Sequence, residues 1–251
     1  MKKPFFKTTI LASLLLVAGS VRSTATPVLA VSIDGITYTT IAIDEGAGDG
    51  SAGAGLEGVV TRTLAGYHGW SVTVIGGLTK PVPGYTAANA LMDLSVDASY
   101  NASGGPGNAN STVLYIAFSE NGFTPVPGGY EVIQTGSATS GAGTGEVRTF
   151  SGGGAGLNTE LDMSNPLLTL GPLANSFNTS GSTGNVPSGA PYSLTIVQIL
   201  TSTALSPAGA TTFSTDASIQ ASVPDGGSTL MLLGAALSGM GLLRLRAIRK
   251  V

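Results

Sequence analysis

Short runs in which apolar and polar residues alternate recur through the middle of the chain. They include Trp70–Val74, Leu94–Ser99, Tyr192–Ile196 and Ala217–Val223. A period of two is typical of a β-strand with one face toward a core and the other toward solvent. Val113–Phe118 is instead continuously apolar, which predicts a strand in the centre of the core.

Turn signals separate these runs. Asp34-Gly35, between two apolar runs, predicts a two-residue β-hairpin turn. Leu161–Leu173 holds two prolines and is predicted as loop or short turn. Five turn-rich stretches are predicted as loops: 46–58, 101–110, 136–145, 152–158 and 175–189. With no long helical period in the body, the pattern predicts an all-β fold, an antiparallel β-sandwich of jelly-roll-like type.

The first 30 residues have the layout of a secretory signal peptide with a signal helix. Three lysines precede an apolar centre at Ile10–Gly19. Val28-Leu29-Ala30 places small or modest residues at the −3 and −1 positions, so we predict cleavage after Ala30, with cleavage after Ala25 as the alternative.

The other end of the chain carries an uncharged apolar run, Ser228–Leu243. As a helix it would span roughly 24 Å, somewhat less than the ~30 Å hydrocarbon core of a bilayer. We predict a transmembrane helix whose basic end lies on the cytoplasmic side. The alternative is a buried C-terminal helix of the exported domain. The basic end consists of Arg244, Arg246, Arg249 and Lys250.

The chain therefore divides into three predicted parts. These are a signal peptide (1–30), an exported domain rich in glycine, serine and threonine (31–222) and a tail (223–251). Within the tail, residues 223–227 form a short motif, 228–243 the helix and 244–251 the basic end. The motif reads Val223, Pro224, Asp225, Gly226, Gly227.

This tail resembles the PEP-CTERM class of bacterial sorting signals, in particular its VPDSG-type variant. Val223-Pro224-Asp225 and Gly227-Ser228-Thr229 match the variant, whereas Gly226 stands where the variant usually has serine. The resemblance implies recognition by an exosortase, an integral-membrane enzyme with a cysteine nucleophile. It also implies a Gram-negative-type envelope and a host that makes exopolysaccharide.

Composition and charge exclude several functional classes. The chain has no cysteine, which removes disulfides, iron–sulfur clusters and thiolate zinc sites. Residues 31–223 contain three basic and 13 acidic residues, a net charge of −10. An acidic body argues against nucleic acid and against docking on anionic lipid.

Candidate catalytic and cofactor motifs are weak. His68, the sole histidine, precedes a predicted strand, and because no GxSxG motif accompanies it we predict a turn or rim residue. Gly53–Gly58 matches GxGxxG, but Val59–Leu64 after it is strand-like, whereas a dinucleotide site needs a helix. We predict no cofactor and no resident metal.

Two clusters leave binding alternatives open. Four acids in a glycine-rich loop suit either calcium or simple solvation; they are Asp44, Glu45, Asp49 and Glu57. Five aromatic residues would stack on sugar rings if exposed together, although burial is typical of aromatics in a sandwich. These are Tyr67, Trp70, Tyr85, Tyr100 and Tyr130.

The sequence favours a non-enzymatic exported protein, anchored transiently in the inner membrane and then sorted to the cell envelope, outer surface or extracellular matrix. Its expected role is structural or adhesive, as in a biofilm, with signal peptidase and exosortase as processing partners. One alternative is a carbohydrate-binding module for exopolysaccharide, which exposed coplanar aromatics would favour. The other is a secreted hydrolase, which a cleft with two close carboxylates would favour.

Overall fold

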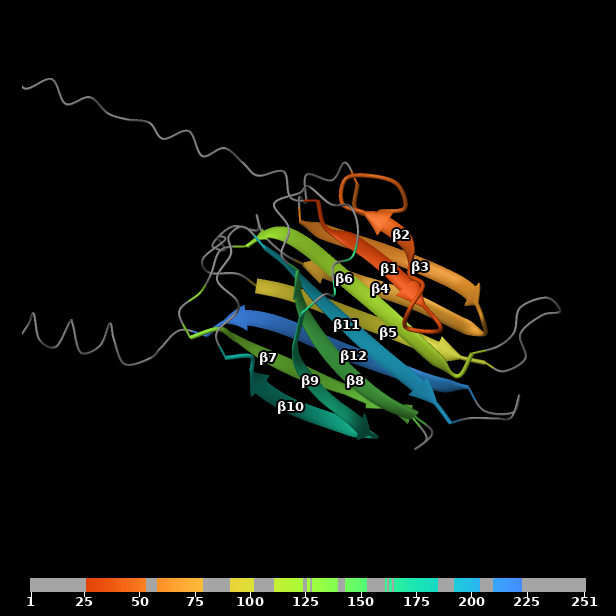
Figure 1. Cartoon of the computed structure of the whole chain (residues 1–251). Coiled ribbons are helices and arrows are strands. Elements are labelled where there is room, and N and C mark those ends of the chain that lie inside the picture. The colour runs from red at the N-terminus through yellow and green to blue at the C-terminus, as the bar shows by residue number, and fades with distance from the viewer. Residues whose placement is uncertain are drawn as a thin grey trace, which may run out of the picture.

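The computed structural model describes residues 26–52, 58–78, 91–101, 111–123, 126, 128–139, 143–152, 161, 163, 165–184, 192–203 and 210–222. These residues form twelve β-strands (Figure 1). The strands are β1 (Val28–Ser32), β2 (Thr39–Ile43), β3 (Val59–Tyr67), β4 (Trp70–Leu78), β5 (Leu91–Tyr100), β6 (Val113–Phe123), β7 (Tyr130–Ala138), β8 (Gly143–Gly152), β9 (Asn165–Ala174), β10 (Ser176–Ser182), β11 (Tyr192–Ser202) and β12 (Thr211–Ala221).

The strands make two six-stranded antiparallel sheets that face each other. Sheet A has the order β2-β1-β6-β11-β8-β9, and sheet B has the order β10-β7-β12-β5-β4-β3. The pairs β8–β9, β7–β10, β6–β11 and β5–β12 are nested along the chain and alternate between the sheets. This is the strand order of an eight-stranded jelly roll, which confirms the predicted sandwich. The hairpins β1–β2 and β3–β4 extend one sheet each.

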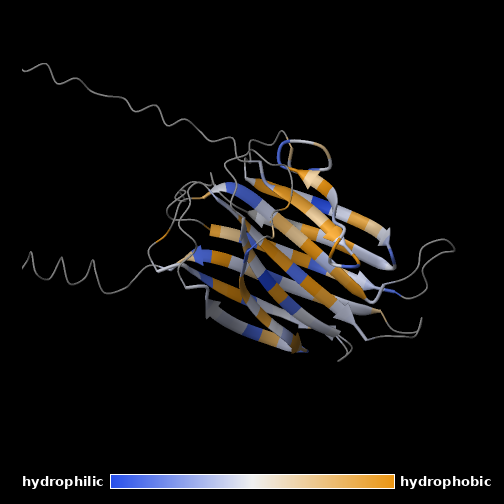
Figure 2. Ribbon diagram, in the orientation of Figure 1, coloured by the Kyte–Doolittle hydropathy of each residue, from blue (hydrophilic) through white to orange (hydrophobic). Residues whose placement is uncertain are grey.

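Alternating runs supply the core between the sheets, as predicted. Trp70, Val72 and Val74 of β4 are at most 1% exposed, and Leu94 and Val96 of β5 are equally buried. Figure 2 shows hydrophobic positions alternating with polar ones along many of the strands. The alternation of apolar and polar residues in the sequence therefore identifies correctly which side chains of these strands face the core.

The continuously apolar run in β6 packs against apolar residues on both faces, although Val113 and Tyr115 are only half-buried. Leu114, Ile116 and Phe118 join the main core, while Ala117 lies in a second apolar cluster with Val197 and Ile199 of β11. Partly buried side chains pack against that second cluster; among them are Tyr38, Phe150, Leu161 and Met163. The predicted central strand is thus confirmed, and burial from both sides explains why it lacks alternation.

A buried polar bridge joins the sheets. The side-chain amide of Gln198 on β11 donates to the carbonyl of Leu94 on β5 and accepts from the hydroxyl of Thr215 on β12. Gln198 is 1% exposed. Because a buried amide without partners is costly, these bonds help to specify how the sheets align.

Two segments predicted as loops contain strands, and the predicted loop 136–145 is strand at both ends, in β7 and β8. Leu161–Leu173 contains most of β9, and the stretch 175–189 contains β10. Both are edge strands that pair on one side only, so prolines are tolerated there and little side-chain burial is needed. The prediction was wrong because edge strands lack the apolar signal on which it relied.

The predicted hairpin at Asp34-Gly35 is present, but its turn is longer than two residues. β1 ends at Ser32 and β2 begins at Thr39. The Asp34 Oδ1 atom accepts hydrogen bonds from the Ser32 hydroxyl (2.7 Å) and from the backbone N–H groups of Ile36 and Thr37 (2.8 Å each). These hydrogen bonds lower the pKa of Asp34 to about 2, and the bond from Ser32 makes the largest contribution.

The folded chain begins earlier than the predicted domain boundary at residue 31. β1 starts at Val28, and Thr26 and Pro27 also belong to the described residues. The signal centre, the motif 223–227, the predicted helix 228–243 and the basic end lie outside the described residues. Within the described part of the chain, no helix has the length and hydropathy needed to cross a membrane.

Candidate functional site: a hydroxyl-lined groove

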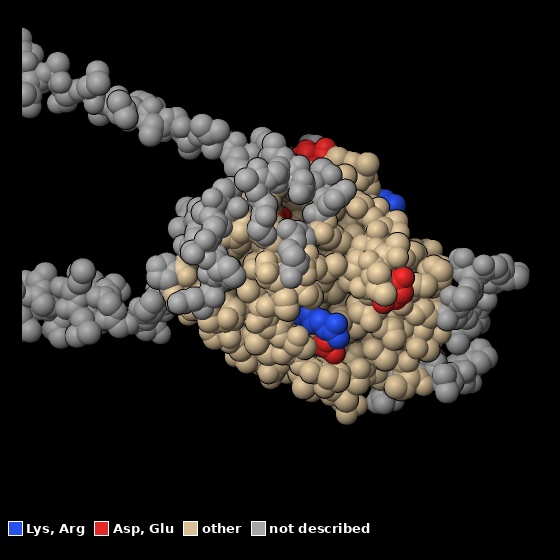
Figure 3. Space-filling view, in the orientation of Figure 1, with Lys and Arg blue, Asp and Glu red and all other residues tan. Residues whose placement is uncertain are grey.

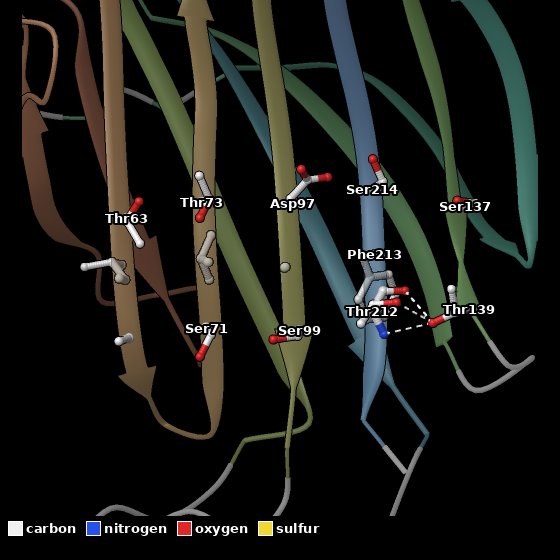
Figure 4. A pocket seen from close by; sticks show the side chains of 14 residues that line it. Thr63, Ser71, Thr73, Asp97, Ser99, Ser137, Thr139, Thr212, Phe213 and Ser214 are labelled. Atoms are coloured by element: carbon white, nitrogen blue, oxygen red, sulfur yellow. Dashed lines mark hydrogen bonds between the residues drawn. The ribbon is translucent and has the colours of Figure 1, made fainter.

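The outer face of sheet B is hollowed by a groove of about 460 Å³ (Figure 4). The lining comes from β3, β4, β5 and β12 and from the end of β7. Its residues are Thr63, Leu64, Ala65, Ser71, Val72, Thr73, Asp97, Ala98, Ser99, Ser137, Thr139, Thr212, Phe213 and Ser214. We call this feature the hydroxyl groove.

Strand register arranges its polar side chains in two rows across the sheet. The first row runs through paired residues on five strands, namely Thr63, Thr73, Asp97, Ser214 and Ser137. The second row pairs Ser71 with Ser99 and Ser99 with Thr212. Thr139 extends it, because its hydroxyl accepts from the Thr212 N–H at 3.2 Å and bonds the Thr212 hydroxyl.

Alternation along each strand separates this polar face from the core. Val72, Ala98 and Phe213 are next to groove hydroxyls in sequence, yet they are 1%, 5% and 3% exposed. The ring of Phe213 packs on Trp70 with ring centroids 5.7 Å apart. The aromatic mass therefore lies beneath the groove, and small hydroxyls face outward (Figure 4).

The groove offers hydrogen bonds of both senses. Serine and threonine hydroxyls each donate and accept, and their short side chains lose little conformational freedom when a ligand binds. Asp97 is the one charged residue in the lining described above. This chemistry suits a ligand rich in hydroxyl groups and disfavours a polyanion.

The groove lies toward one end of the sandwich, and the described chain starts and finishes at the other. Ser99 is near the end of β5, and Thr212 is near the start of β12. β12 finishes at the other end, where Ala221 pairs with Tyr130 at the start of β7. Val28 enters β1 opposite Ser119, toward that same end (Figure 1). We call the end with Val28 and Ala221 the terminal pole.

His68 lies in the turn between β3 and β4, as predicted. Its φ of 49° is a left-handed turn conformation, and its ring meets Tyr67 edge-on at 4.8 Å. Of the GxGxxG match, residues 53–57 lie outside the described residues. The segment after it is the strand β3 and not a helix, so the dinucleotide interpretation lacks its helix, as expected.

Two acids of the glycine-rich loop, Asp44 and Asp49, accept hydrogen bonds from the backbone. Asp49 Oδ1 accepts from the N–H groups of Ser51 (2.9 Å) and Thr61 (3.0 Å), and Asp44 Oδ2 accepts from the N–H of Gly58 (2.8 Å). Burial raises the pKa of Asp44. Glu57 lies outside the described residues, and among those described no three acidic, histidine or cysteine side chains are grouped to hold a metal.

Three of the five aromatic candidates for sugar stacking are core residues. Trp70 and Tyr130 are fully buried, and Tyr100 is 3% exposed. The Trp70 indole N–H donates to the Ser111 carbonyl at 2.7 Å, and the Tyr130 and Tyr192 hydroxyls bond each other. A sugar platform from these three rings is therefore wrong. Tyr67 is partly buried against the same core, and Tyr85 lies outside the described residues.

One pair of neighbouring carboxyl groups was not predicted from the sequence. Asp93 on β5 and Asp216 on β12 lie diagonally across neighbouring strands, since Asp93 is opposite Ser218 and Asp216 is opposite Ser95. Burial is the largest of the effects that raise the pKa of Asp93 to about 6. The negative charge of Asp216 and its hydrogen bond raise the pKa further. Because 123 residues separate the two acids, only strand register reveals the pair.

This pair meets part of the condition set for a hydrolase. One carboxyl is desolvated, and the two are hydrogen-bonded. Glycosidases hold their carboxyls roughly 5–10 Å apart to admit a sugar or a water. Two directly bonded carboxyls are closer than that, and neither belongs to the lining of the hydroxyl groove.

Charges are sparse on the face of the molecule seen in Figure 3. On β8, the Arg148 guanidinium pairs with the Glu146 carboxylate at 2.5 Å. An exposed pair of this kind contributes about 0–1 kcal/mol. The visible surface is otherwise mostly uncharged.

The chain matches no protein-family model and no curated protein. Among solved structures, the adhesin domain of Epf from Streptococcus pyogenes is 10% identical with a TM-score of 0.36, and the match covers 77% of this chain and 57% of that one. The K1 cleaved adhesin domain of Lys-gingipain from Porphyromonas gingivalis is 12% identical with a TM-score of 0.28, covering 65% and 91%.

A third match is the enzymatically active domain of bacteriophage CBA120 tailspike protein 4, at 12% identity and a TM-score of 0.26, covering 59% and 19%. All three TM-scores are below 0.5. The function of this chain must therefore be argued from its own residues.

Proposed function

We propose that this protein is exported, held briefly in the inner membrane by its tail, and sorted to the cell envelope or extracellular matrix in a structural or adhesive role. The observation that carries the proposal is the arrangement of the jelly roll. The described chain starts and ends at the terminal pole, and the hydroxyl groove lies toward the opposite end.

A membrane tail attached at the terminal pole would leave the groove facing away from the bilayer. Ser222, whose N–H donates to the Gly129 carbonyl at 3.0 Å, directly precedes the motif 223–227. The motif would therefore lie between the folded domain and the membrane, where an exosortase in the membrane would recognise it. The sorting step rests on the resemblance of residues 223–251 to the PEP-CTERM class.

The anchoring step is tested by truncation before Ser228 in the native host. Without residues 228–251 the domain should appear in the periplasm or medium, whereas the full chain should fractionate with membrane or envelope. Equal fractionation of the two chains would count against the anchor. Folding of both is checked by circular dichroism after purification.

The hydroxyl groove favours a second candidate function, the binding of a polysaccharide that carries no acidic groups. Protein interfaces are enriched in aromatic residues, methionine and arginine, and nucleic acid requires basic residues. Among the described residues, the lining contains no basic side chain, and its one aromatic ring, Phe213, is buried. The rows of exposed hydroxyls beside Asp97 match the hydroxyl groups of a sugar chain.

Affinity electrophoresis tests this candidate with the full chain in detergent. The native gel contains polysaccharide washed from the host cells, separated on an anion exchanger into acidic and non-acidic fractions. Retardation by the non-acidic fraction, weakened about tenfold or more in Ser214→Tyr, is expected.

Ser180→Tyr is the matched control, because Ser180 is also an exposed serine of sheet B but lies on β10, outside the hydroxyl groove and in the lining of a separate hollow. Its mobility should equal that of the unaltered chain. Absence of retardation by the non-acidic fraction, or equal effects of the two tyrosines, would remove the groove from consideration.

A further inference from the structure

The first strand of the fold contains the position at which the leader was expected to be cut. All five residues of β1 are buried, and Leu29, Ala30 and Val31 have no exposed surface. Leu29 and Val31 belong to the core between the sheets. Such burial is typical of a structural strand, whereas the end of a removable leader must be extended and accessible to a protease.

β1 also has hydrogen-bonding neighbours on both sides. Ala30 pairs with Ala117 of β6 and Thr40 of β2, and Val28 pairs with Ser119 and Ile43. The contacts continue upstream, since the Asp44 N–H donates to the Pro27 carbonyl at 3.0 Å. The ordered chain in sheet A therefore reaches back at least to Pro27.

Cleavage after Ala30 would remove Val28, Leu29 and Ala30 from this interior position. β2 and β6 would lose the partner that separates them, leaving backbone groups unpaired in a buried region. The space of the Leu29 side chain would become a cavity in the core. The remaining Val31-Ser32 is too short to hold β2 against the sheet.

We infer that signal peptidase instead cleaves between Ala25 and Thr26, so that the mature protein begins at Thr26. The inference rests on the proposed export. Ser23-Thr24-Ala25 provides small residues at the −3 and −1 positions, as the enzyme requires. The reaction is a hydrolysis: the Ala25–Thr26 amide bond breaks, water supplies the oxygen of the new Ala25 carboxylate, and Thr26 keeps the amino group.

The chosen bond also suits the layout of the leader. The apolar centre ends at Gly19, which leaves five residues between it and Ala25 and ten between it and Ala30. Cleavage after Ala25 keeps β1 complete and places the new N-terminus beside its strand at the terminal pole. The structure thus distinguishes two sites that both satisfy the small-residue rule.

The test is the N-terminal peptide of the full-length protein purified from its native host, identified by mass spectrometry. A mature chain that starts at Thr26 is the expected result. Ala25→Tyr should cause an uncut precursor to accumulate. Ala30→Val, the matched control, should still yield a chain that starts at Thr26, because Ala30 is the −1 residue of the rejected site and lies outside the −3 and −1 positions of the Ala25–Thr26 bond.

A mature chain that starts at Val31, or normal processing of Ala25→Tyr, overturns the inference while leaving export intact. A chain that keeps Met1 and stays in the cytoplasm overturns export itself and, with it, this site. The two failures are therefore distinguishable in the same experiment.

Discussion

Single buried polar side chains specify how the two sheets meet. Gln198 is the clearest case, because its amide bonds both β5 and β12 of the opposite sheet. Thr215 also donates to the Val96 carbonyl at 3.4 Å. No sequence pattern marked Gln198, which lies between Ile196 and Leu200 in the row of β11 residues that faces the main core.

We predict that Gln198→Leu lowers the free energy of unfolding by about 1–3 kcal/mol, because the Thr215 hydroxyl and the Leu94 carbonyl lose a buried partner. The double variant Gln198→Leu/Thr215→Val should recover part of this loss, since it also removes the buried hydroxyl that has lost its amide partner. Urea unfolding of the chain ending at Ser222 measures both. If the losses caused by Gln198→Leu and Thr215→Val simply add in the double variant, the two side chains do not stabilise the fold through each other.

Asp93 makes stability depend on pH. Its pKa is raised from 3.8 to about 6 in the folded state, so the folded protein retains a proton that the unfolded chain releases. The free energy of unfolding should therefore fall as pH rises from about 4 to about 6.

Asp93→Asn tests this prediction. In this variant the free energy of unfolding should fall less between those pH values. Asp97→Asn on the same strand is the control, because Asp97 is exposed, and it should retain the decline. Thermal melts across the pH range measure the effect. An identical slope in Asp93→Asn would assign the pH dependence to other groups.

Elements with a buried face were predictable from the sequence, and edge elements were not. β4, β5, β6, β11 and β12 coincide with apolar runs because their inward side chains fill the core. β9 and β10 carry mostly exposed or partly exposed residues. Their strand conformation is supplied by hydrogen bonds to β8 and β7, which composition does not record.

β1 gives a prediction at this scale. Compared with a chain from Thr26 to Ser222, a chain from Val31 to Ser222 should lose on the order of 3–6 kcal/mol of unfolding free energy, from the burial of Val28 and Leu29 alone. Urea unfolding compares the two chains. Equal stability would mean that the first half of β1 is dispensable.

At the scale of the whole molecule, nested strand pairing brings both ends of the described chain to one pole. β5 pairs with β12 and β6 with β11, so segments about 100 residues apart lie side by side. The groove is a product of the same pairing, because its two rows draw on β3, β4, β5, β12 and the end of β7. The chain has no cysteine, so core packing must hold this arrangement together.

For the intact protein in its host, we predict that Pro224→Ala blocks processing of the tail while membrane insertion continues. The reason is that the helix 228–243 is unchanged, whereas the motif loses its proline. The mass of the C-terminal peptide and membrane fractionation measure the two steps separately.

Gly226→Ser is the matched control, because it brings the motif closer to the usual VPDSG form and should be processed normally. An unchanged mature mass in Pro224→Ala would argue against exosortase recognition.

The sequence by itself determined the all-β class, the central strands and the acidic, cysteine-free character of the body, because periodicity and composition are local properties. The tertiary structure alone decided the edge strands, the burial of the aromatic residues, the Asp93–Asp216 pair and the hydroxyl groove. Each of these depends on register between strands that are distant along the chain, and burial is assigned by neighbours rather than by the residue itself.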